Sequence, residues 1–378
     1  MKIGIPTEIT DGEARVAATP ETVKKLTANQ HHTVMVQAGA GSGASIPDAQ
    51  FAAVGATIVN DAAAAYAADI VLKVRAPDAS EVAMLRSGTV LIGLLNPFRQ
   101  DGIAALAKQG VTAFALEALP RTTRAQPMDA LSSQANIAGY KAVIVAADAY
   151  NRLMPMFITA AGTVKAARVL VLGVGVAGLQ AIATAKRLGA VVEASDVRPP
   201  VREQVESLGA KFLDVPYLTD EEREIAQGSG GYARPMPADW MRRQAELVHE
   251  RALQSDIVIT TALIPGRPAP KLIKAATVAA MKPGSVLVDL AAEQGGNIEG
   301  CELDHTVIKN GVTIIGIANL PSLAAADASA LYARNLLNFL NLLVDPKSGE
   351  LKINREDDIV AAALQCSGGE VTKKQERT

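Results

Sequence analysis

The sequence predicts an α/β chain of two doubly wound domains, each built on a parallel sheet with helices on both faces. Two observations lead to this prediction. Short apolar runs alternate with Ala-rich helical stretches in both halves of the chain, and a glycine-rich turn follows one apolar run near the middle. The 378 residues suffice for two cores, and 49% hydrophobic but only 3% aromatic content suits Ala-rich helices packed on sheets.

The first half reads as a series of strands separated by helices. Helical stretches such as "TPETVKKLTAN" begin with a Thr-Pro pair, which favours the start of a helix. This alternation of strand and helix is typical of parallel βαβ units. The expected strands are Lys2–Ile5, Thr33–Gln37, Thr57–Val59, Ile70–Val74, Val90–Leu94 and Thr112–Leu116.

The same alternation returns after residue 165, so the second half is expected to form its own sheet. The expected strands there are Val169–Leu172, Val191–Ser195, Lys211–Leu213, Ile257–Thr260, Ser285–Asp289 and Thr313–Ile317. Two long helical stretches, 132–153 and 324–344, are expected to join the halves. We therefore predict a discontinuous first domain (1–132 plus 325–378), a second domain (133–324) and a cleft between them.

Composition and charge exclude several classes of function. A net charge of −2 gives no basic surface for nucleic acid or for an acidic membrane. Two cysteines, Cys301 and Cys366, are too few for a disulfide framework or a thiolate metal site. The N-terminus lacks the apolar core of a signal peptide, and the apolar runs fall short of the roughly 20 residues that span a bilayer. We expect a cytoplasmic chain whose polar end, residues 367–378, is a frayed tail or a linker.

The most informative motif is the turn "VLGVGVAGLQ", in which three glycines follow a strand and open a helix. Gly173 permits the tight turn, Gly175 lets the backbone approach a diphosphate, and Gly178 lets the helix pack closely on the sheet. The helix N-terminus then attracts the negative charge. We therefore predict a Rossmann-like dinucleotide site, with the diphosphate beside Gly173, Gly175, Val176, Ala177 and Gly178.

An acidic residue completes this motif. Asp196 lies 23 residues after Gly173, at the end of the next expected strand, where its carboxylate can accept hydrogen bonds from ribose hydroxyls. A carboxylate there repels a 2′-phosphate, so the sequence favours NAD (NADH/NAD⁺) over NADP. Val197 and Arg198 follow it in the expected site, and Arg198 could instead bind a phosphate, which weakens the preference.

Two further segments are expected near the nucleotide. Thr261, Ala262 and Leu263 follow the strand at 257–260, and open α/β sheets bind ligands at the carboxyl ends of their strands. The segment from Asp214 to Trp240 is longer than a crossover needs, and its "GSGGY" core places Tyr232 among glycines. Its length suggests a lid that closes over the nucleotide, a partner-binding segment or disorder. The alternative is a solvated, charged surface loop.

A polar cluster precedes the first long connecting helix. It contains Arg121, Gln126, Asp129 and Ser132. An arginine there can hold a phosphate or pair with an aspartate, and a glutamine can hydrogen-bond a carboxamide. Composition alone favours helix capping beside a hydrated hinge over a binding role for this cluster. Its place at the junction of the predicted domains puts it near the expected cleft.

Four stretches together resemble the NAD(H)-binding component of the proton-translocating nicotinamide nucleotide transhydrogenases. The likeness runs from residue 1 to about 345. The family's usual "PRISRAQ" reads "PRTTRAQ" here and is followed by Pro127, a difference that bears on the conformation of this loop. The four stretches are "PRTTRAQPMDALSSQANIAGY", "VLGVGVAGLQAIATAKRLGA", "TTALIPGRPAPKLI" and "SVLVDLAAEQGGN".

The resemblance implies a Re/Si-specific, proton-translocating transhydrogenase that is active only with its partners. In that family this component is a homodimer of two-domain subunits, and it passes hydride between NADH and an NADP held on a separate domain or subunit. A membrane-spanning subunit moves protons, so the chain would be peripheral to the inner membrane.

By resemblance, Arg121, Gln126 and Asp129 form the loop at the nicotinamide end, Ser132 lies near the ring, and Tyr232 belongs to a mobile loop.

The alternative is a dehydrogenase similar to alanine dehydrogenase, which shares the two-domain architecture. Arg15 and Lys73 match positions where that family binds its 2-oxo acid. Carbonyl reduction needs a proton donor, but the dehydrogenase's His is Asn96 here, and its Asp is Glu293. Hydride transfer between two nicotinamides needs no such donor, so Arg15 and Lys73 are expected to form structural ion pairs. A third reading is a non-catalytic NAD sensor.

Overall fold

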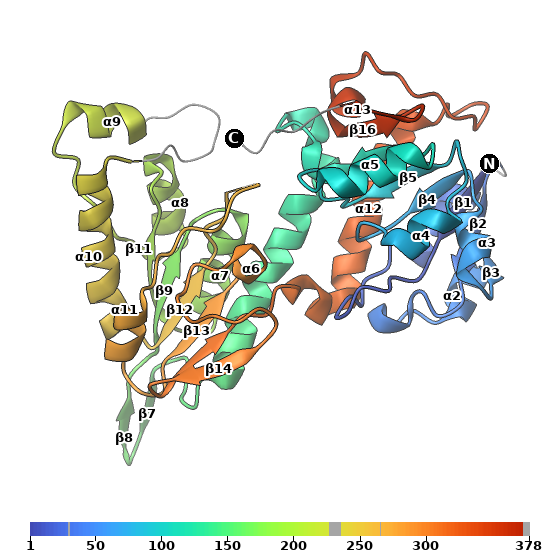
Figure 1. The fold of residues 1–378 in the computed structure, drawn as a ribbon. Coiled ribbons are helices and arrows are strands. Elements are labelled where there is room, and N and C mark those ends of the chain that lie inside the picture. Colours follow the sequence, from blue (N-terminus) through green and yellow to red (C-terminus); the bar gives the residue numbers. More distant parts are fainter. Residues whose placement is uncertain (29–30, 227–235, 265, 373–378) are drawn as a thin grey trace. The chain divides into compact units, whose positions relative to one another are not determined.

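The computed structural model describes residues 1–28, 31–226, 236–264 and 266–372 (Figure 1). The chain divides into two compact units. Unit 1 holds Met1–Gln134 and Pro321–Thr378, and unit 2 holds Ala135–Leu320. The helix α6 (Ala130–Ala149) begins in unit 1 and continues into unit 2, and α12 (Ala325–Leu343) follows the return of the chain to unit 1.

Among the described residues, unit 1 holds an eight-stranded sheet in the order β17-β16-β6-β5-β4-β1-β2-β3. The strands from β6 to β3 are parallel, whereas β16 is antiparallel to β6 and to β17. The strands are β1 (Lys2–Ile5), β2 (Thr33–Gln37), β3 (Thr57–Val59), β4 (Ile70–Leu72), β5 (Val90–Gly93), β6 (Thr112–Ala115), β16 (Leu364–Ser367) and β17 (Glu370–Val371).

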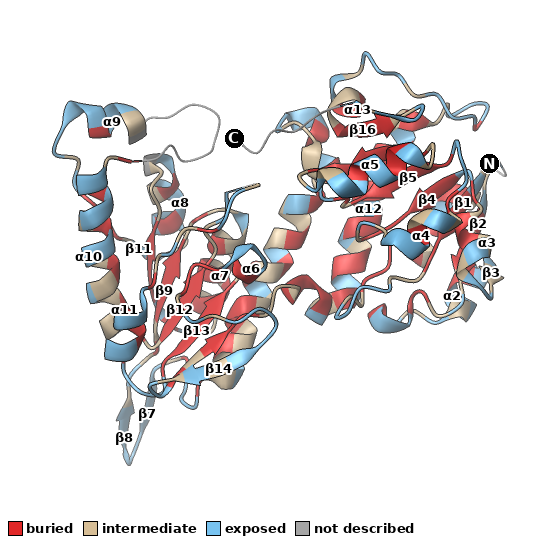
Figure 2. Ribbon diagram, viewed as in Figure 1, coloured by how far each residue is buried: buried red, intermediate tan, exposed pale blue. Residues whose placement is uncertain are grey.

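Helices cover both faces of this sheet because its strands carry apolar side chains on both sides. Ile70 and Leu72 of β4 lie in the core formed with α1, α12 and α13, whereas Val71 lies in the core formed with α3, α4 and α5. Figure 2 shows the buried strands between exposed helix surfaces. The remaining helices of unit 1 are α1 (Pro20–Thr27), α2 (Asp48–Ala52), α3 (Ala62–Tyr66), α4 (Ala79–Met84), α5 (Gln100–Lys108) and α13 (Asp358–Ala363).

Unit 2 holds, within the described part of the chain, a seven-stranded sheet in the order β11-β10-β9-β12-β13-β15-β14. All neighbours are parallel except β14 and β15, which form a hairpin. The strands are β9 (Arg168–Leu172), β10 (Val191–Ser195), β11 (Lys211–Phe212), β12 (Ile257–Thr260), β13 (Val286–Asp289), β14 (Thr306–Lys309) and β15 (Val312–Ile315).

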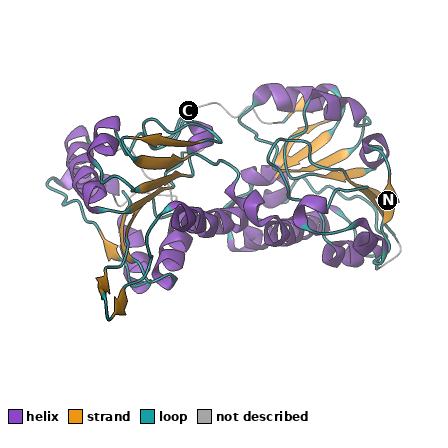
Figure 3. Ribbon diagram, turned by 90° about the horizontal axis from the view of Figure 1, so that it is seen from below, coloured by secondary structure: helices purple, strands orange, loops and turns teal. Residues whose placement is uncertain are grey.

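The second sheet is also covered on both faces, as the helices of Figure 3 show. Val169 and Val171 of β9 lie in the core with α6, α7 and α8, and Leu170 and Leu172 lie in the core with α10 and α11. The helices of unit 2 are α7 (Val176–Arg187), α8 (Arg202–Ser207), α9 (Asp220–Ala226), α10 (Ala238–Gln254) and α11 (Ala275–Ala280). A separate hairpin joins β7 (Phe157–Thr159) and β8 (Gly162–Val164).

The predicted class, an α/β chain with parallel-rich sheets in two domains, is confirmed. The antiparallel edges were not predicted. The tail prediction is wrong for residues 367–371, because Gly368 and Gly369 form the turn between β16 and β17. The strand β14 was missed although Asn310-Gly311, both with positive φ, is a strong hairpin signal.

The strand order creates one topological switch point in each sheet. In unit 1 the chain runs outward in both directions from β1 and β4, and in unit 2 from β9 and β12. Ligands of open α/β sheets bind at the carboxyl ends of the strands at such points. Among the described helices, none is long and apolar enough to span a membrane.

Candidate functional site

The glycine turn, residues 173–178, follows β9 at the switch point of unit 2. Gly173 has a φ of +94°, a left-handed conformation that side chains disfavour. A Cβ on Gly178 would lie 2.0 Å from the carbonyl oxygen of Gly173, so the helix approaches the turn closely because residue 178 has no side chain. A Cβ on Gly175 would meet nothing within 4 Å, which leaves room for a ligand beside the turn.

The helix α7 starts directly at this open space. Gly175 is its N-cap and Val176 its first residue, and Val176 is 37% exposed. The first N–H groups of a helix have no partner within the helix, so they favour an anion there. On the other side, a Cβ on Gly139 of α6 would lie 2.1 Å from the carbonyl oxygen of Ala177. Gly139, which no sequence motif indicated, therefore lets α6 pack against the start of α7.

Asp196, at the end of β10, is joined to the glycine turn. Its Oδ2 accepts a hydrogen bond from the backbone N–H of Val174 at 2.7 Å. Its Oδ1 accepts from the backbone and Nε of Arg198, both at 2.9 Å, and this hydrogen bonding raises the pKa of Arg198. Arg198 therefore forms an ion pair with Asp196, and both predicted residues lie at one edge of the turn. Val197, between them, packs against the cluster around Trp240.

The predicted wall after β12 contacts the same turn. The Thr261 hydroxyl donates to the carbonyl oxygen of Gly173 at 2.9 Å, and the Thr261 backbone N–H donates to Leu172 at 2.8 Å. Ala262 follows, and the Leu263 side chain is 43% exposed. The structure thus brings the turn, the acidic residue and the wall together at the carboxyl ends of β9, β10 and β12.

The wall is held by a residue that the sequence motifs did not identify as part of the site. Asn297 is fully buried, and its side-chain amide hydrogen-bonds both the N–H and the carbonyl oxygen of Ala262. Asn297 ends the stretch "VLVDLAAEQGGN", and no local pattern indicates that its amide reaches a segment 35 residues earlier.

The polar cluster of residues 121–132 lies in unit 1. Asp129 accepts hydrogen bonds from the Ser132 backbone N–H at 2.9 Å and from the Ser132 hydroxyl at 2.5 Å, so this pair caps α6. Arg121 and Gln126 are exposed. The cluster therefore combines helix capping with two exposed polar side chains that can reach a ligand or a partner.

The loop carrying Gln126 is fixed from two sides. The Arg124 guanidinium bonds both Asp357 carboxylate oxygens, at 2.7 and 2.8 Å, beside the N-terminus of α13. The carbonyl oxygen of Pro127 accepts from the side chains of Asn335 and Asn338 on α12, at 2.8 and 3.0 Å. The loop that departs from the family pattern is thus anchored by side chains of unit 1.

The predicted site residues are divided between the two units. Arg121, Gln126, Asp129 and Ser132 belong to unit 1, and the turn, Asp196 and the wall belong to unit 2. That these two groups face one cleft remains a prediction. The candidate lid residue Tyr232, with the glycines beside it, lies outside the described residues.

Charged side chains of unit 1 itself occupy the switch point of its sheet. Lys73, after β4, is 1% exposed, and its ammonium lies 2.6 Å from Glu81 and 3.2 Å from Glu8. Glu8 follows β1 and also accepts from the backbone N–H of Val74 at 2.6 Å, while burial raises its pKa despite Lys73. The carboxylate after β1 thus bridges to the end of β4, where a ligand would otherwise enter.

The charge of Arg15 is also compensated by a carboxylate of the same unit. It is 4% exposed and bonds Glu13 at 2.6 Å and the Gln134 side chain at 2.8 Å. Burial alone would raise the pKa of Glu13, but the hydrogen bonds and charge of Arg15 lower it to about 2. Arg15 and Lys73 therefore form the ion pairs that the sequence predicts for them.

After β5, the position that holds a histidine in the dehydrogenase holds Asn96, whose side chain does not titrate. Asn96 there is exposed, with a φ of 51°, and its backbone N–H donates to Glu117 at 2.7 Å. The four histidines lie elsewhere along the chain. His31 and His32 precede β2, His249 lies within α10, and His305 precedes β14.

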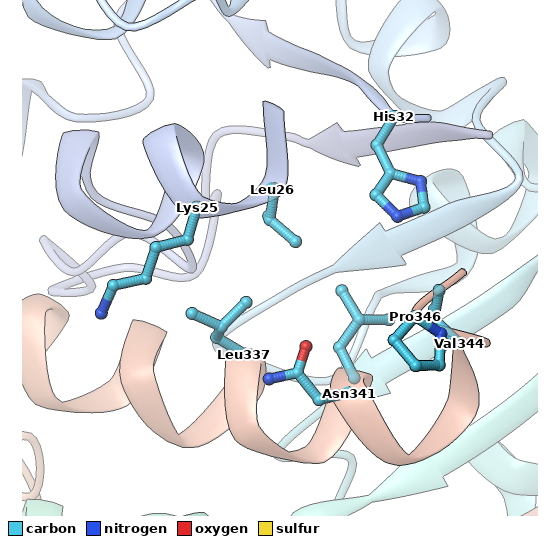
Figure 4. Close-up of a pocket in the computed structure, with 8 residues that line it drawn as sticks. Lys25, Leu26, His32, Leu337, Asn341, Val344 and Pro346 are labelled. Atoms are coloured by element: carbon cyan, nitrogen blue, oxygen red, sulfur yellow. The ribbon is translucent and has the colours of Figure 1, made fainter. Parts of the chain in front are cut away.

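A pocket of about 380 Å³ lies in unit 1 between α1 and the C-terminal end of α12 (Figure 4). Leu26 and Leu337 line it together with Lys25, Asn341 and His32. None of the predicted site residues lines this pocket, and His32 directly precedes β2, at the amino ends of the parallel strands. It is therefore separate from the strand ends where α/β sheets bind ligands.

Two family models together match most of the chain. Residues 4–138 match the family described as alanine dehydrogenase/PNT, N-terminal domain, and residues 142–374 match alanine dehydrogenase/PNT, C-terminal domain.

The chain is more similar in sequence to a relative named as a transhydrogenase subunit than to one named alanine dehydrogenase. The chain is 48% identical to NAD(P) transhydrogenase subunit alpha of Cereibacter sphaeroides, covering 98% of this chain and 71% of the relative. It is 32% identical to alanine dehydrogenase of Halomonas elongata, covering 98% and 95%. A crystal structure of transhydrogenase from Sinorhizobium meliloti matches with a TM-score of 0.84 at 47% identity, over 98% of this chain and 99% of that one.

Proposed function

Because the chain belongs to the alanine dehydrogenase/PNT family, we propose that it is the NAD(H)-binding, hydride-transferring component of an NAD(P) transhydrogenase. It passes hydride between NADH and an NADP⁺ held on a partner domain or subunit. The enzyme is of the Re/Si-specific, proton-translocating type, and this chain is active only together with its partners.

The observation that carries the proposal is the arrangement at the switch point of unit 2. The space beside Gly175 is open, the N-terminus of α7 adjoins it, and the Asp196 carboxylate lies at the end of the neighbouring strand. These features fit a dinucleotide, with its diphosphate at the helix N-terminus and a ribose at Asp196. The similarity to transhydrogenase subunits over 98% of the chain points to the same ligand.

The chain's own residues bind and orient in this scheme, and they transfer no proton. The bound nicotinamide supplies the hydride. Gly173, Gly175, Val176, Ala177 and Gly178 hold the diphosphate end, and Thr261, Ala262 and Leu263 form a wall beside the adenine or ribose. Arg121, Gln126, Asp129 and Ser132 orient the nicotinamide end toward the partner. Alignment of two rings at close distance is the main requirement of such a transfer.

Reduction of an oxo acid is disfavoured by the contents of unit 1. Lys73 and Arg15, which match substrate-binding positions of the dehydrogenase, are buried and hydrogen-bonded to carboxylates. Asn96 cannot donate a proton as a histidine would. A chain that keeps the nucleotide site, has Arg15 and Lys73 in internal ion pairs and has no histidine at position 96 fits a relay of hydride between two nicotinamides.

The proposed partners are a second copy of this chain, an NADP(H)-binding domain or subunit, and a membrane-spanning proton-channel subunit that keeps the chain peripheral to the inner membrane.

A surface suited to the second copy is the hairpin β7–β8, which forms a two-stranded sheet of its own. Met156, Phe157 and Ile158 there are 60%, 47% and 73% exposed. Exposed strand edges with large apolar side chains favour association. Ile158→Lys should therefore shift the chain toward the monomer in sedimentation equilibrium.

The activity test uses the purified chain with NADH in two mixtures. One mixture contains pyruvate and ammonium, and the other contains the NADP-binding component of a transhydrogenase loaded with thio-NADP⁺. We expect hydride transfer to thio-NADP⁺, followed by its absorbance, and no turnover of pyruvate. Oxidation of NADH by pyruvate at an enzymatic rate would show an alanine dehydrogenase instead. NADH binding without transfer in either mixture would favour a sensor.

The preference for NADH over NADPH is tested separately by fluorescence titration at fixed salt. Asp196 repels a 2′-phosphate, so the wild-type chain should bind NADH more tightly. Asp196→Asn removes the charge of the side chain but keeps an acceptor for the Val174 N–H. The variant should therefore show a smaller difference in affinity between NADH and NADPH. Equal affinities of the wild-type chain for NADH and NADPH would contradict the role assigned to Asp196.

A further inference from the structure

The loop after β13 is tied to the end of its own strand. Asp289, the last residue of β13, is fully buried. Its carboxylate accepts from the backbone N–H of Ala291 and of Ile298, both at 2.9 Å. A buried carboxylate with two backbone donors fixes both ends of the segment between them. Asn297, directly before Ile298, therefore has a defined position relative to the sheet.

From this position Asn297 reaches the wall of the proposed nucleotide site. Its Oδ1 accepts from the Ala262 N–H at 3.0 Å, and its Nδ2 donates to the Ala262 carbonyl oxygen at 2.9 Å. The same Nδ2 donates to the carbonyl oxygen of Pro270 at 2.8 Å. One side chain thus satisfies both polar groups of Ala262 and joins the two ends of residues 262–270.

Ala262 in turn lies against the glycine turn. A Cβ placed on Gly173 would lie 3.1 Å from the Ala262 backbone nitrogen and 2.7 Å from the Thr261 hydroxyl oxygen. The Thr261 hydroxyl is bonded to the Gly173 carbonyl oxygen. The backbone of Thr261 and Ala262 therefore packs directly on the residue that shapes the turn.

We propose that Asn297 is a positioning residue for the nucleotide site: it holds the wall of Thr261, Ala262 and Leu263 against the glycine turn, so that the wall is formed before the dinucleotide binds. This inference rests on the proposed function. A preformed wall binds more tightly because ordering it costs nothing at the moment of binding. Asn297 acts through Ala262, and no contact of its own with the nucleotide is required.

Replacing the Asn297 side-chain amide leaves backbone polar groups without a hydrogen-bond partner. In Asn297→Ala the N–H and carbonyl oxygen of Ala262 lose their side-chain partner, and the backbone must move to find water. In Asn297→Asp one oxygen still accepts from Ala262, but the second faces two carbonyl oxygens that need a donor. Both variants should therefore release the wall while the strands of the sheet stay paired.

The experiment measures NADH binding by fluorescence titration for the wild type, Asn297→Ala and Asn297→Asp, at a temperature where their circular dichroism spectra coincide. Both variants should bind NADH about tenfold or more weakly. With an NADP-binding partner, KM for NADH should rise in the same proportion, while kcat at saturating NADH should stay within about threefold.

The matched control is Thr277→Val, an isosteric change in the same unit. Thr277 is 5% exposed and its hydroxyl lies 2.8 Å from Nδ1 of His249, so the variant also loses a hydrogen bond of a buried side chain. It touches neither the wall nor the turn and should keep wild-type affinity for NADH. A similar loss of affinity in Thr277→Val would show a general effect of stability and overturn the inference.

Hydrogen exchange keeps the proposal testable if the Asn297 variants fail to fold. In the wild-type chain, peptides covering residues 257–264 should be protected before NADH is added and should change little on its addition. Low protection that rises strongly with NADH would mean that the wall forms only on binding, which contradicts the proposal. If the wild type binds no NADH, the proposed function fails. If it binds and Asn297→Ala binds equally well, only this inference fails.

Discussion

The ammonium of Lys73 lies 2.6 Å from a carboxylate oxygen of Glu81, with 1% and 3% of the two side chains exposed. Glu8 contacts the same ammonium from the other side of the switch point in unit 1. Buried charges of this kind are tolerated because each has a partner of opposite sign. The position that a dehydrogenase would use for an oxo acid thus belongs to the internal structure of this unit.

Lys73→Met should destabilise the chain strongly, because it leaves Glu8 and Glu81 buried without their cation. The expected loss is about 3–5 kcal/mol in the free energy of unfolding, measured by urea denaturation. Lys25→Met is the control, since Lys25 and Glu21 form an exposed pair on α1. That change should cost at most about 1 kcal/mol. Equal midpoints for Lys73→Met and the wild type would contradict the structural role of this lysine.

Gly175→Ala and Gly178→Ala should separate binding from folding. The added methyl at 175 meets open space, and the backbone there has a φ of −82°, so stability should change by no more than about 0.5 kcal/mol. The same methyl occupies the space for the diphosphate, and NADH affinity should fall about tenfold or more.

At 178 the methyl would lie 2.0 Å from the Gly173 carbonyl oxygen, so both stability and NADH affinity should fall. Gly102→Ala, on α5, also meets nothing within 4 Å and should change neither affinity nor fold. Thermal unfolding and fluorescence titration of the same samples give both quantities. Unchanged NADH affinity in Gly175→Ala would place the diphosphate elsewhere.

Glu117→Gln should alter how stability depends on pH. Burial raises the pKa of Glu117 from 4.5 to about 7, although the backbone N–H groups of Asn96 and Leu95 act to lower it. The folded state therefore keeps this proton while the unfolded chain releases it, and the contribution of Glu117 to stability, complete below about pH 4.5, is lost by about pH 7.

The wild type should accordingly lose more stability between pH 5 and pH 8 than Glu117→Gln, in which no proton is released. Urea midpoints at several pH values measure the two slopes. Glu356→Gln, at an exposed position outside this network, should keep the wild-type slope. Parallel curves for Glu117→Gln and the wild type would show that Glu117 is ionised throughout this range.

Gln126→Asn should affect hydride transfer more than binding. The change shortens an exposed side chain by one methylene, while the loop stays fixed by Asn335, Asn338 and Arg124. NADH affinity should stay within a few fold, and transfer to a partner-bound thio-NADP⁺ should slow by about tenfold or more, because ring alignment is sensitive to small displacements. Gln50→Asn, exposed on α2, is the control. Weaker binding with unchanged transfer would contradict the assigned role.

Much of the fold could be predicted because its signals are local. β1, β2, β3, β10 and β12 have the bounds that the apolar runs predict, and α1 begins at the Pro that follows its Thr cap. Two edge strands, β14 and β17, were missed for a physical reason, whereas the edge strands β3 and β11 were predicted. β14 and β17 carry polar and exposed residues, so their apolar periodicity is weak, and their pairing depends on a neighbouring strand.

The sequence by itself determined the alternation of strands and helices, the glycine turn and the acidic residue that follows it, since all of these depend on neighbours along the chain. Only the tertiary structure decided which distant residues meet. Asn297 reaches Ala262 and Asn335 reaches Pro127, and the Tyr332 hydroxyl donates to the carbonyl oxygen of Lys73 across 259 positions of the chain. Such pairs form when whole helices and strands pack together, and no local periodicity encodes them.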